Sequence, residues 1–237
     1  SVILMKRKIF NLFLIILMAM VFSPIVHAEI EKPTGAEWLV AEGENHVWYK
    51  IEGTTLTIGG SGAMPKWTNS SSDDNYYQKA PWYNKNITNI IIGDEITIIG
   101  ENSFYKNDYL VSFKIGKNVQ KLESQALREA PKLENIEFGE KLEFIGVGNF
   151  YKTEITSLTL PEGLKEIANF AFRNNNKLTK IIFPSTLEKI ENSSFSLSTK
   201  NALKEIVSYN TTPPTIGGSS AFENVNIDKL TIPSGSI

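Results

Sequence analysis

A pattern of about 23 residues recurs six times in this chain and constrains its fold more than any other feature. Each copy begins with an aliphatic residue. The first residues of the six copies are Ile87, Leu110, Leu133, Ile155, Leu178 and Leu203, and a seventh copy starts at Ile227. Successive copies start 22 to 25 residues apart. A near-constant period in the twenties is typical of a solenoid, in which one supersecondary unit stacks on copies of itself.

The fourth copy, residues 155–172, shows the apolar positions most clearly. Leu158 and Leu160 are two residues apart, which is the period of a strand with one buried face. Pro161 follows and ends the strand, as Gly or Pro does in most other copies. A second short apolar pair comes next, and a large apolar residue closes the copy from a helical or irregular corner. The closing residues are Phe104, Leu127, Phe150, Phe172, Phe195 and Phe222.

A single copy buries too little apolar surface to fold alone. Each fully buried side chain stabilises the fold by about 1.5–3 kcal/mol, whereas ordering the backbone costs about 1–2 kcal/mol for every residue. We therefore expect six stacked turns over residues 87–226, joined by a continuous parallel sheet around an aliphatic interior. The interior side chains should include Ile90, Ile92, Phe113, Ile115, Ile136, Phe138, Leu158, Leu160, Ile181 and Phe183.

The segment before the repeats, residues 29–86, is rich in aromatic residues and predicts a small β module. Residues 46–58 alternate apolar and polar side chains around Glu52-Gly53, which indicates a hairpin. We favour a cap that covers the open face of the first repeat, because solenoids need protected ends. The alternative is an aromatic platform for sugar rings. Its candidate residues are Trp48, Trp67 and Trp82.

The repeat unit L-x-x-I-x-I-P-x-x-L-x-x-I-x-x-x-A-F resembles the BspA-type leucine-rich repeat of bacterial surface proteins. The resemblance extends to GTTLTIGGSGAM (53–64) and APWY (80–83) before the array, and to TTPPTIGGSSAF (211–222) and LTIPSGSI (230–237) at its end. It implies a leucine-rich-repeat solenoid, mostly β with short helical or irregular corners. Family members often carry Cys after the A-F pair. Here Asn107 and 174–176 lie near that position, where amides can bind turn backbone.

Residues 1–28 have the three parts of a secretory signal peptide: the basic stretch 5–8, the apolar run 9–22 and a small residue, Ala28, at the cut. We expect cleavage after Ala28 and no stable membrane span in the mature protein, which would be secreted or displayed on the cell surface. The net charge of −2 becomes more negative without the basic segment, which argues against nucleic-acid binding. The chain has no Cys, so disulfides and Cys-based metal sites are excluded.

Motifs for catalysis and metal binding are missing from the sequence. His46 is the only histidine after residue 28, and no G-x-S-x-G elbow accompanies it. Asp73-Asp74-Asn75 lacks the spaced ligands of a calcium loop, so a solvated loop is the better interpretation. We therefore predict a protein that is not an enzyme and that uses no cofactor or metal ion.

The leading hypothesis for function is a binding or adhesion scaffold for host or neighbouring-cell proteins, which is what the resemblance implies. In each first strand the residues beside the inward aliphatics point outward. These candidate binding residues are Ile91, Lys114, Glu137, Thr159, Ile182 and Val207, flanked by Asn89, Ser112, Asn135, Ser157, Lys180 and Glu205. The alternatives are a carbohydrate or cell-wall binding module and the non-catalytic part of a larger exported enzyme. We expect residues 227–237 to begin a further, truncated repeat.

Overall fold

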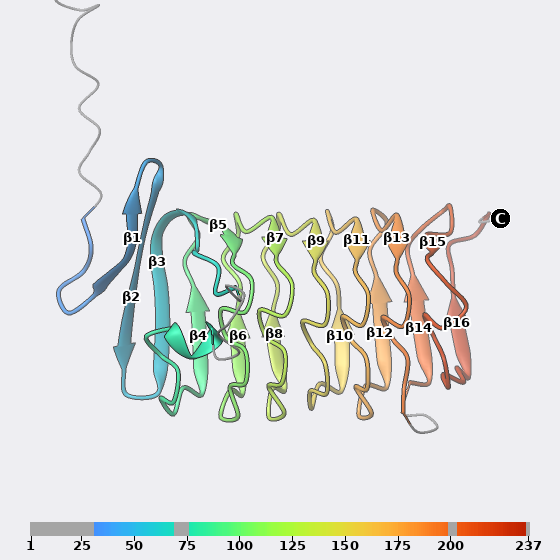
Figure 1. Cartoon of the computed structure of the whole chain (residues 1–237). Coiled ribbons are helices and arrows are strands. Elements are labelled where there is room, and N and C mark those ends of the chain that lie inside the picture. The colour runs from blue at the N-terminus through green and yellow to red at the C-terminus, as the bar shows by residue number, and fades with distance from the viewer. Residues whose placement is uncertain (1–30, 69–75, 199–202, 236–237) are drawn as a thin grey trace, which may run out of the picture. The chain divides into compact units, whose positions relative to one another are not determined.

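Each repeat of the sequence forms one turn of a coil that carries two short strands (Figure 1). The computed structural model describes residues 31–68, 76–198 and 203–235, so the predicted signal peptide lies outside the described residues. The first strands of the turns are β4 (Asn89–Ile92), β6 (Ser112–Lys114), β8 (Asn135–Glu137), β10 (Ser157–Thr159), β12 (Lys180–Phe183), β14 (Glu205–Ser208) and β16 (Lys229–Thr231). The second strands are β5 (Ile96–Ile99), β7 (Lys121–Leu122), β9 (Phe144–Ile145), β11 (Glu166–Ile167), β13 (Lys189–Ile190) and β15 (Thr215–Ile216).

Strands at the same place in successive turns pair in parallel and form two ladders. In the first ladder Ile90 of β4 lies opposite Phe113 of β6, which lies opposite Ile136 of β8. The second ladder runs without a break from β5 to β15. Both ladders turn their aliphatic residues into one shared core.

The expectation of one continuous sheet is wrong, because the first ladder is interrupted between β8 and β10. Figure 1 shows the wider gap between these two strands. The corner from Phe150 to Ile155 has one residue fewer than the corresponding corners of the two preceding turns. This shorter corner accounts for β10 leaving the position from which it could pair with β8, while β9 and β11 stay paired.

The predicted interior residues differ in burial on the two sides of the break. Ile136 and Phe138 lie beside it and are only half-buried, although they pack against the core. The other predicted interior residues are buried as expected, and these are Ile90, Ile92, Phe113, Ile115, Leu158, Leu160, Ile181 and Phe183.

The closing aromatic residues form a stack along the core. Ring centroids are 5.0 Å apart between Phe150 and Phe172, 5.2 Å between Phe172 and Phe195, and 5.3 Å between Phe195 and Phe222, with the rings nearly parallel. Leu127 fills the same position in the second turn and is fully buried. The stack therefore stops at Leu127, and Phe104 packs instead against the Trp82 ring at 5.5 Å.

The corners are chains of turns and contain no helix among the described residues, where the only helical element is the 3-10 turn η1 (Tyr76–Lys79). In the first four turns, the residues two before and two after the closing position adopt left-handed backbone. They include Asn102, Lys106, Gln125, Glu129, Gly148, Lys152, Phe170 and Asn174. This conformation costs roughly 1–2 kcal/mol at a residue other than Gly. It turns backbone N–H groups toward the next turn, as in Phe150 N–H to the Ala171 carbonyl at 2.7 Å.

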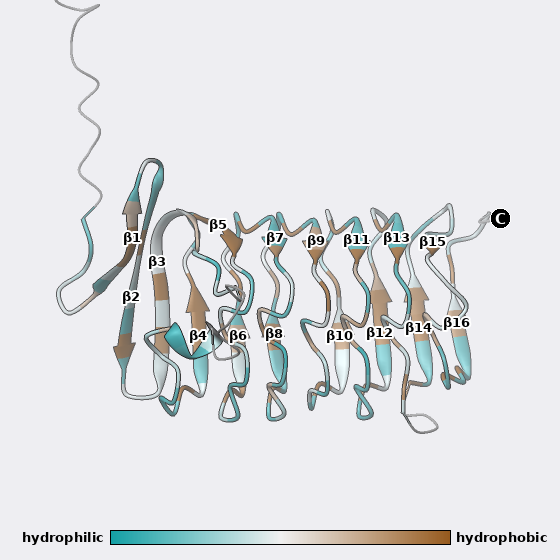
Figure 2. Cartoon of the chain, viewed as in Figure 1, coloured by the Kyte–Doolittle hydropathy of each residue, from teal (hydrophilic) through white to brown (hydrophobic). Residues whose placement is uncertain are grey.

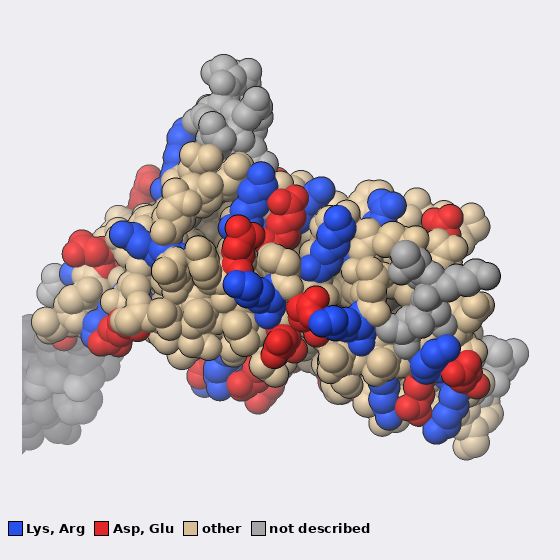
Figure 3. Space-filling view, turned by 90° about the horizontal axis from the view of Figure 1, so that it is seen from below, with Lys and Arg blue, Asp and Glu red and all other residues tan. Residues whose placement is uncertain are grey.

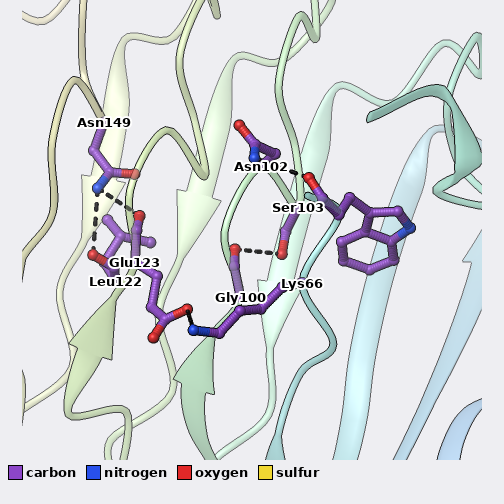
Figure 4. Close-up of polar contacts among 8 residues, drawn as sticks. Lys66, Gly100, Asn102, Ser103, Leu122, Glu123 and Asn149 are labelled. Atoms are coloured by element: carbon purple, nitrogen blue, oxygen red, sulfur yellow. Dashed lines mark hydrogen bonds and ion pairs between the residues drawn. The ribbon is translucent and has the colours of Figure 1, made fainter. Parts of the chain in front are cut away.

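Side-chain amides and hydroxyls bind the remaining corner carbonyls (Figure 4). The Asn149 amide donates to the carbonyls of Leu122 and Glu123 at 3.3 and 2.9 Å. Ser103 Oγ donates to the Gly100 carbonyl at 2.7 Å. Asn175 has the role predicted near the absent Cys, because its amide donates to the carbonyls of Phe150 and Phe172. Asn107 was also predicted to bind turn backbone, and its Oδ1 accepts the Tyr109 N–H at 3.2 Å.

The module before the array is an antiparallel sheet of β1 (Glu37–Glu42), β2 (Asn45–Glu52) and β3 (Thr55–Ala63). The predicted hairpin at Glu52-Gly53 is confirmed, with Glu52 opposite Thr55 and Gly53 left-handed. β3 pairs in parallel with β4 through its first half and with β5 through its end, so it begins both ladders. Trp82 packs edge-on against Trp67 and Tyr49, and these rings cover the first turn. Across the part of the chain with described coordinates, no helix has the length and apolar character to span a membrane.

We expect Phe150→Ala to lower the free energy of unfolding by about 3–5 kcal/mol, because it removes one ring of the stack and leaves a cavity. Hydrogen exchange should show the greatest loss of protection in the third and fourth turns, since turns are coupled mainly to their neighbours. Phe150→Leu is the matched control and should cost less, because the second turn carries Leu127 at this position. Uniform loss of protection along the whole array would contradict this local coupling.

Candidate binding surfaces

The twelve outward residues predicted from the first strands lie in two columns, which we call the strand face. The first column holds Asn89, Ser112, Asn135, Ser157, Lys180 and Glu205, and the second holds Ile91, Lys114, Glu137, Thr159, Ile182 and Val207. Parallel pairing puts each residue opposite its equivalent in the next turn, as for Ile91 and Lys114. The break between β8 and β10 divides the face into two halves of three turns each.

Residues at both ends extend the columns, and the sequence analysis had left them out. Thr55 and Thr57 of β3 lie opposite Asn89 and Ile91. At the other end, Lys229 and Thr231 of β16 continue the two columns beyond Glu205 and Val207; Lys229 lies opposite Glu205. The seventh copy, IDKLTIP, already carried the signal for the second extension in its spacing.

Charged residues on the strand face pair with one another. Lys114 Nζ lies 2.6 Å from Glu137 Oε1, and both side chains are exposed. This hydrogen bond is the main cause that raises the pKa of Lys114. In the other half, Glu205 lies between Lys229 at 3.0 Å and Lys180 at 3.1 Å. Hydrogen bonds from Lys229 first and Lys180 second lower the pKa of the Glu205 carboxyl.

Aliphatic side chains are the second component of the strand face. Figure 2 shows β12 and β14 changing from hydrophilic at their start to hydrophobic further along the strand. Ile91 is 39% exposed, and Ile182 and Val207 are half-buried. The face therefore combines rigid β-branched groups with charges that are already neutralised.

The tryptophans do not form the exposed platform suggested by the sequence. Trp67 and Trp82 are 9% and 4% exposed and lie in the core under the front module. Trp48 is half-buried, and its ring lies so close to Gly59 that a Cβ there would come within 2.2 Å of it. The structure therefore gives no support to a sugar-stacking site on these three residues.

Tyrosines instead gather around a pocket of about 410 Å³ between η1 and the corners of the first two turns. Tyr77, Tyr83, Tyr105 and Tyr109 line it, together with Lys106. Sequence reasoning missed this site because the four tyrosines come from two separate segments, with Tyr77 and Tyr83 before β4 and Tyr105 and Tyr109 after β5. A signal for the site was available in Tyr105, which follows the closing residue Phe104 just as Tyr151 follows Phe150.

Metal-ligating side chains do not cluster in the described segments. No group of three His, Cys, Asp or Glu side chains there could hold a metal ion. His46 lies in β2 with its ring edge-on to Trp38 at 6.3 Å. Seen from below, the array shows basic and acidic side chains close together along its length, with no patch of one sign on that side (Figure 3).

Comparison with known proteins identifies the repeat. The sequence model of the BspA type leucine rich repeat region matches 6 copies, over residues 77–202 and 129–237. A leucine-rich repeat protein from Eubacterium ventriosum has a similar structure, with a TM-score of 0.61 and 20% identity over 80% of this chain and 58% of that one. A leucine-rich repeat protein from Bacteroides ovatus gives a TM-score of 0.50 and 20% identity over 83% of this chain and 54% of that one. The chain thus spans a little over half of each of these two proteins. No curated protein matches the sequence.

We expect Lys229→Met to raise the pKa of Glu205 toward the ordinary value, measured by NMR titration of its carboxyl carbon. Because the folded protein lowers this pKa, the ion pairs add stability that is complete above about pH 4.3 and is lost as the pH falls through the lower, folded value. Lys204→Met is the control, since Lys204 pairs with Asp228 at 3.6 Å. An unchanged titration in Lys229→Met would contradict the role of this ion pair.

Proposed function

The chain belongs to the BspA-type leucine-rich repeat family, and from this premise we propose that it is a non-catalytic scaffold that binds proteins through the strand face. Residues 1–28 would act as its signal peptide, so that the mature protein, from residue 29, is secreted or displayed on the cell surface. Its front module, residues 29–86, would cap the array over 87–226. The partner would be a protein on a host or neighbouring cell, and the role would be adhesion.

The observation that carries this proposal is the regular presentation of outward side chains. Parallel pairing holds equivalent residues in register within each half of the face, as for Asn89 and Ser112 before the break and for Lys180 and Glu205 beyond it. Neighbouring strands in a sheet lie about 4.8 Å apart, so the columns form a rigid grid. A grid that is ordered before binding loses little conformational entropy when a partner docks.

The composition of the grid favours a protein partner over a polyanion. With Lys229 included the face has three Lys and two Glu, and each of these lysines pairs with a glutamate, so it has no cluster of unpaired basic groups of the kind that attracts phosphates. Exposed Ile91 and half-buried Ile182 and Val207 offer apolar contacts between those charges. Apolar groups surrounded by polar ones are typical of protein interfaces.

The test exchanges the two charges of one ion pair on the strand face. Lys114→Glu combined with Glu137→Lys keeps the attraction between the residues, so the melting temperature should change by no more than a few degrees. The signs presented to a partner are reversed. Binding to immobilised extracellular-matrix proteins, measured by surface plasmon resonance, should therefore weaken by about tenfold or more.

A matched control exists on the second ladder. Lys165 and Glu143 pair at 3.1 Å, and their side chains are 50% and 51% exposed, compared with 50% and 66% for Lys114 and Glu137. Exchanging Lys165 and Glu143 should leave binding unchanged. Equal weakening by both exchanges, or no weakening by the first, would move the binding site away from the strand face.

A further inference from the structure

The pocket between η1 and the first two corners is separate from the strand face and has the composition of a small-molecule site. Its volume of about 410 Å³ lies in the range of about 300–1,000 Å³ that is typical of ligand pockets. Trp82 and Phe104 are buried and form an apolar floor. The Trp82 N–H donates to the Ser103 carbonyl at 2.7 Å, so the floor has a satisfied polar group.

Tyrosine rings form the walls of this pocket. Tyr77 packs edge-on against Tyr105 at 4.8 Å and against Tyr83 at 5.5 Å, and this contact fixes the orientation of all three rings. Tyr109 also lines the pocket and is 45% exposed. Tyr109 therefore differs from Trp67 and Trp82, whose rings contact each other and are buried over the first turn.

Polar groups of both kinds surround the rings. Lys106 Nζ lies over the rings of Tyr77 and Tyr105, at 5.2 and 5.5 Å from their centroids. The Tyr105 hydroxyl donates to Glu129 at 3.3 Å. Burial first and the Glu129 charge second raise the pKa of Tyr105, so its hydroxyl remains protonated at neutral pH. The lining also has an exposed Asp108, and an exposed Lys85 balances it.

This combination matches one class of ligand better than others. The two lysines of the lining are balanced by two carboxylates, so neither an anion nor a cation would be favoured overall. A purely apolar ligand would strip water from these polar groups without replacing their hydrogen bonds. A sugar ring has an apolar face that can stack on an aromatic ring, and hydroxyls around its edge that can both donate and accept hydrogen bonds.

We propose that the pocket binds a pyranose unit of an uncharged glycan. Lys132 Nζ lies 5.3 Å from the Tyr109 ring centroid, so the sugar stacks on the ring face that Lys132 does not cover, while Lys106 and Glu129 bind its hydroxyls. The pocket contains no residue of the strand face, so glycan binding can be tested independently of the proposed protein binding.

The experiment uses the purified mature protein and three uncharged disaccharides: cellobiose, lactose and N,N′-diacetylchitobiose. Saturation-transfer NMR should show binding of at least one of them, and a titration gives its dissociation constant. Tyr109→Ala should weaken this binding by about tenfold or more, equivalent to about 1.4 kcal/mol. Tyr109→Phe keeps the ring and should bind within about threefold of the wild type.

Tyr209→Ala is the matched control, because Tyr209 is 53% exposed in the last described turns, far along the sequence from the pocket. It should bind the disaccharide as the wild type does. An unchanged melting temperature of Tyr109→Ala shows that lost binding is not lost folding. The proposal is overturned if none of the disaccharides binds at millimolar concentration, or if Tyr209→Ala loses as much binding as Tyr109→Ala. Binding of a proline-rich peptide alone, in a manner that depends on Tyr109, would also overturn it in favour of a peptide site.

Discussion

The backbone of each turn finds its main hydrogen-bond partners in the adjacent turns, because the strands of the array have only two to four residues and the described parts of the corners contain no helix. Two strand ladders and the corner bonds, such as Phe172 N–H to the Ser194 carbonyl at 2.8 Å, hold each turn to the next. The stacked phenylalanines add the same kind of contact between side chains. A turn removed from its neighbours would lose these bonds and expose its core, so the turns depend on one another for stability.

This dependence explains which parts of the fold could be predicted from sequence. Aliphatic residues two apart predicted the first strands, and the closing Phe positions predicted the interior, because both features repeat in every turn. The left-handed corner residues could not be predicted from residue type, since the positions are occupied by Asn102, Gln125 and Phe170 alike. Their conformation is imposed by hydrogen bonds to the next turn, which residue type alone does not reveal.

The break between β8 and β10 was also missed, although its cause is visible in the spacing. One residue fewer between Phe150 and Ile155 changes the interval from 23 to 22 residues, which looks like ordinary variation in a repeat. In three dimensions it ends the pairing of one ladder and leaves Ile136 half-buried. Composition alone left the exposed aromatic platform open as an alternative to the favoured cap. Composition locates aromatic residues in a module but does not say which of them face the first turn.

The strand face uses positions that the repeat does not need for packing, whereas the tyrosine pocket also includes the buried rings of Trp82 and Phe104. The strand face consists of outward residues, whose identity varies from Ile91 to Glu137 while the inward neighbours stay apolar. The twelve predicted residues were all placed on this face, since strand alternation determines it. Residues from η1 and from two corners line the tyrosine pocket, and these segments come together only in the folded chain.

The Lys–Glu pairs of the strand face limit what a partner can gain from charge alone. An exposed ion pair contributes little net free energy because solvent screens it, so a partner carboxylate can replace Glu137 beside Lys114 at little net gain. Such exchange selects partners with a matching order of charges, and it adds little affinity. Affinity would then depend on burying the aliphatic groups. Because Ile182 and Val207 are adjacent in register, the half of the face beyond the break offers the larger apolar contact.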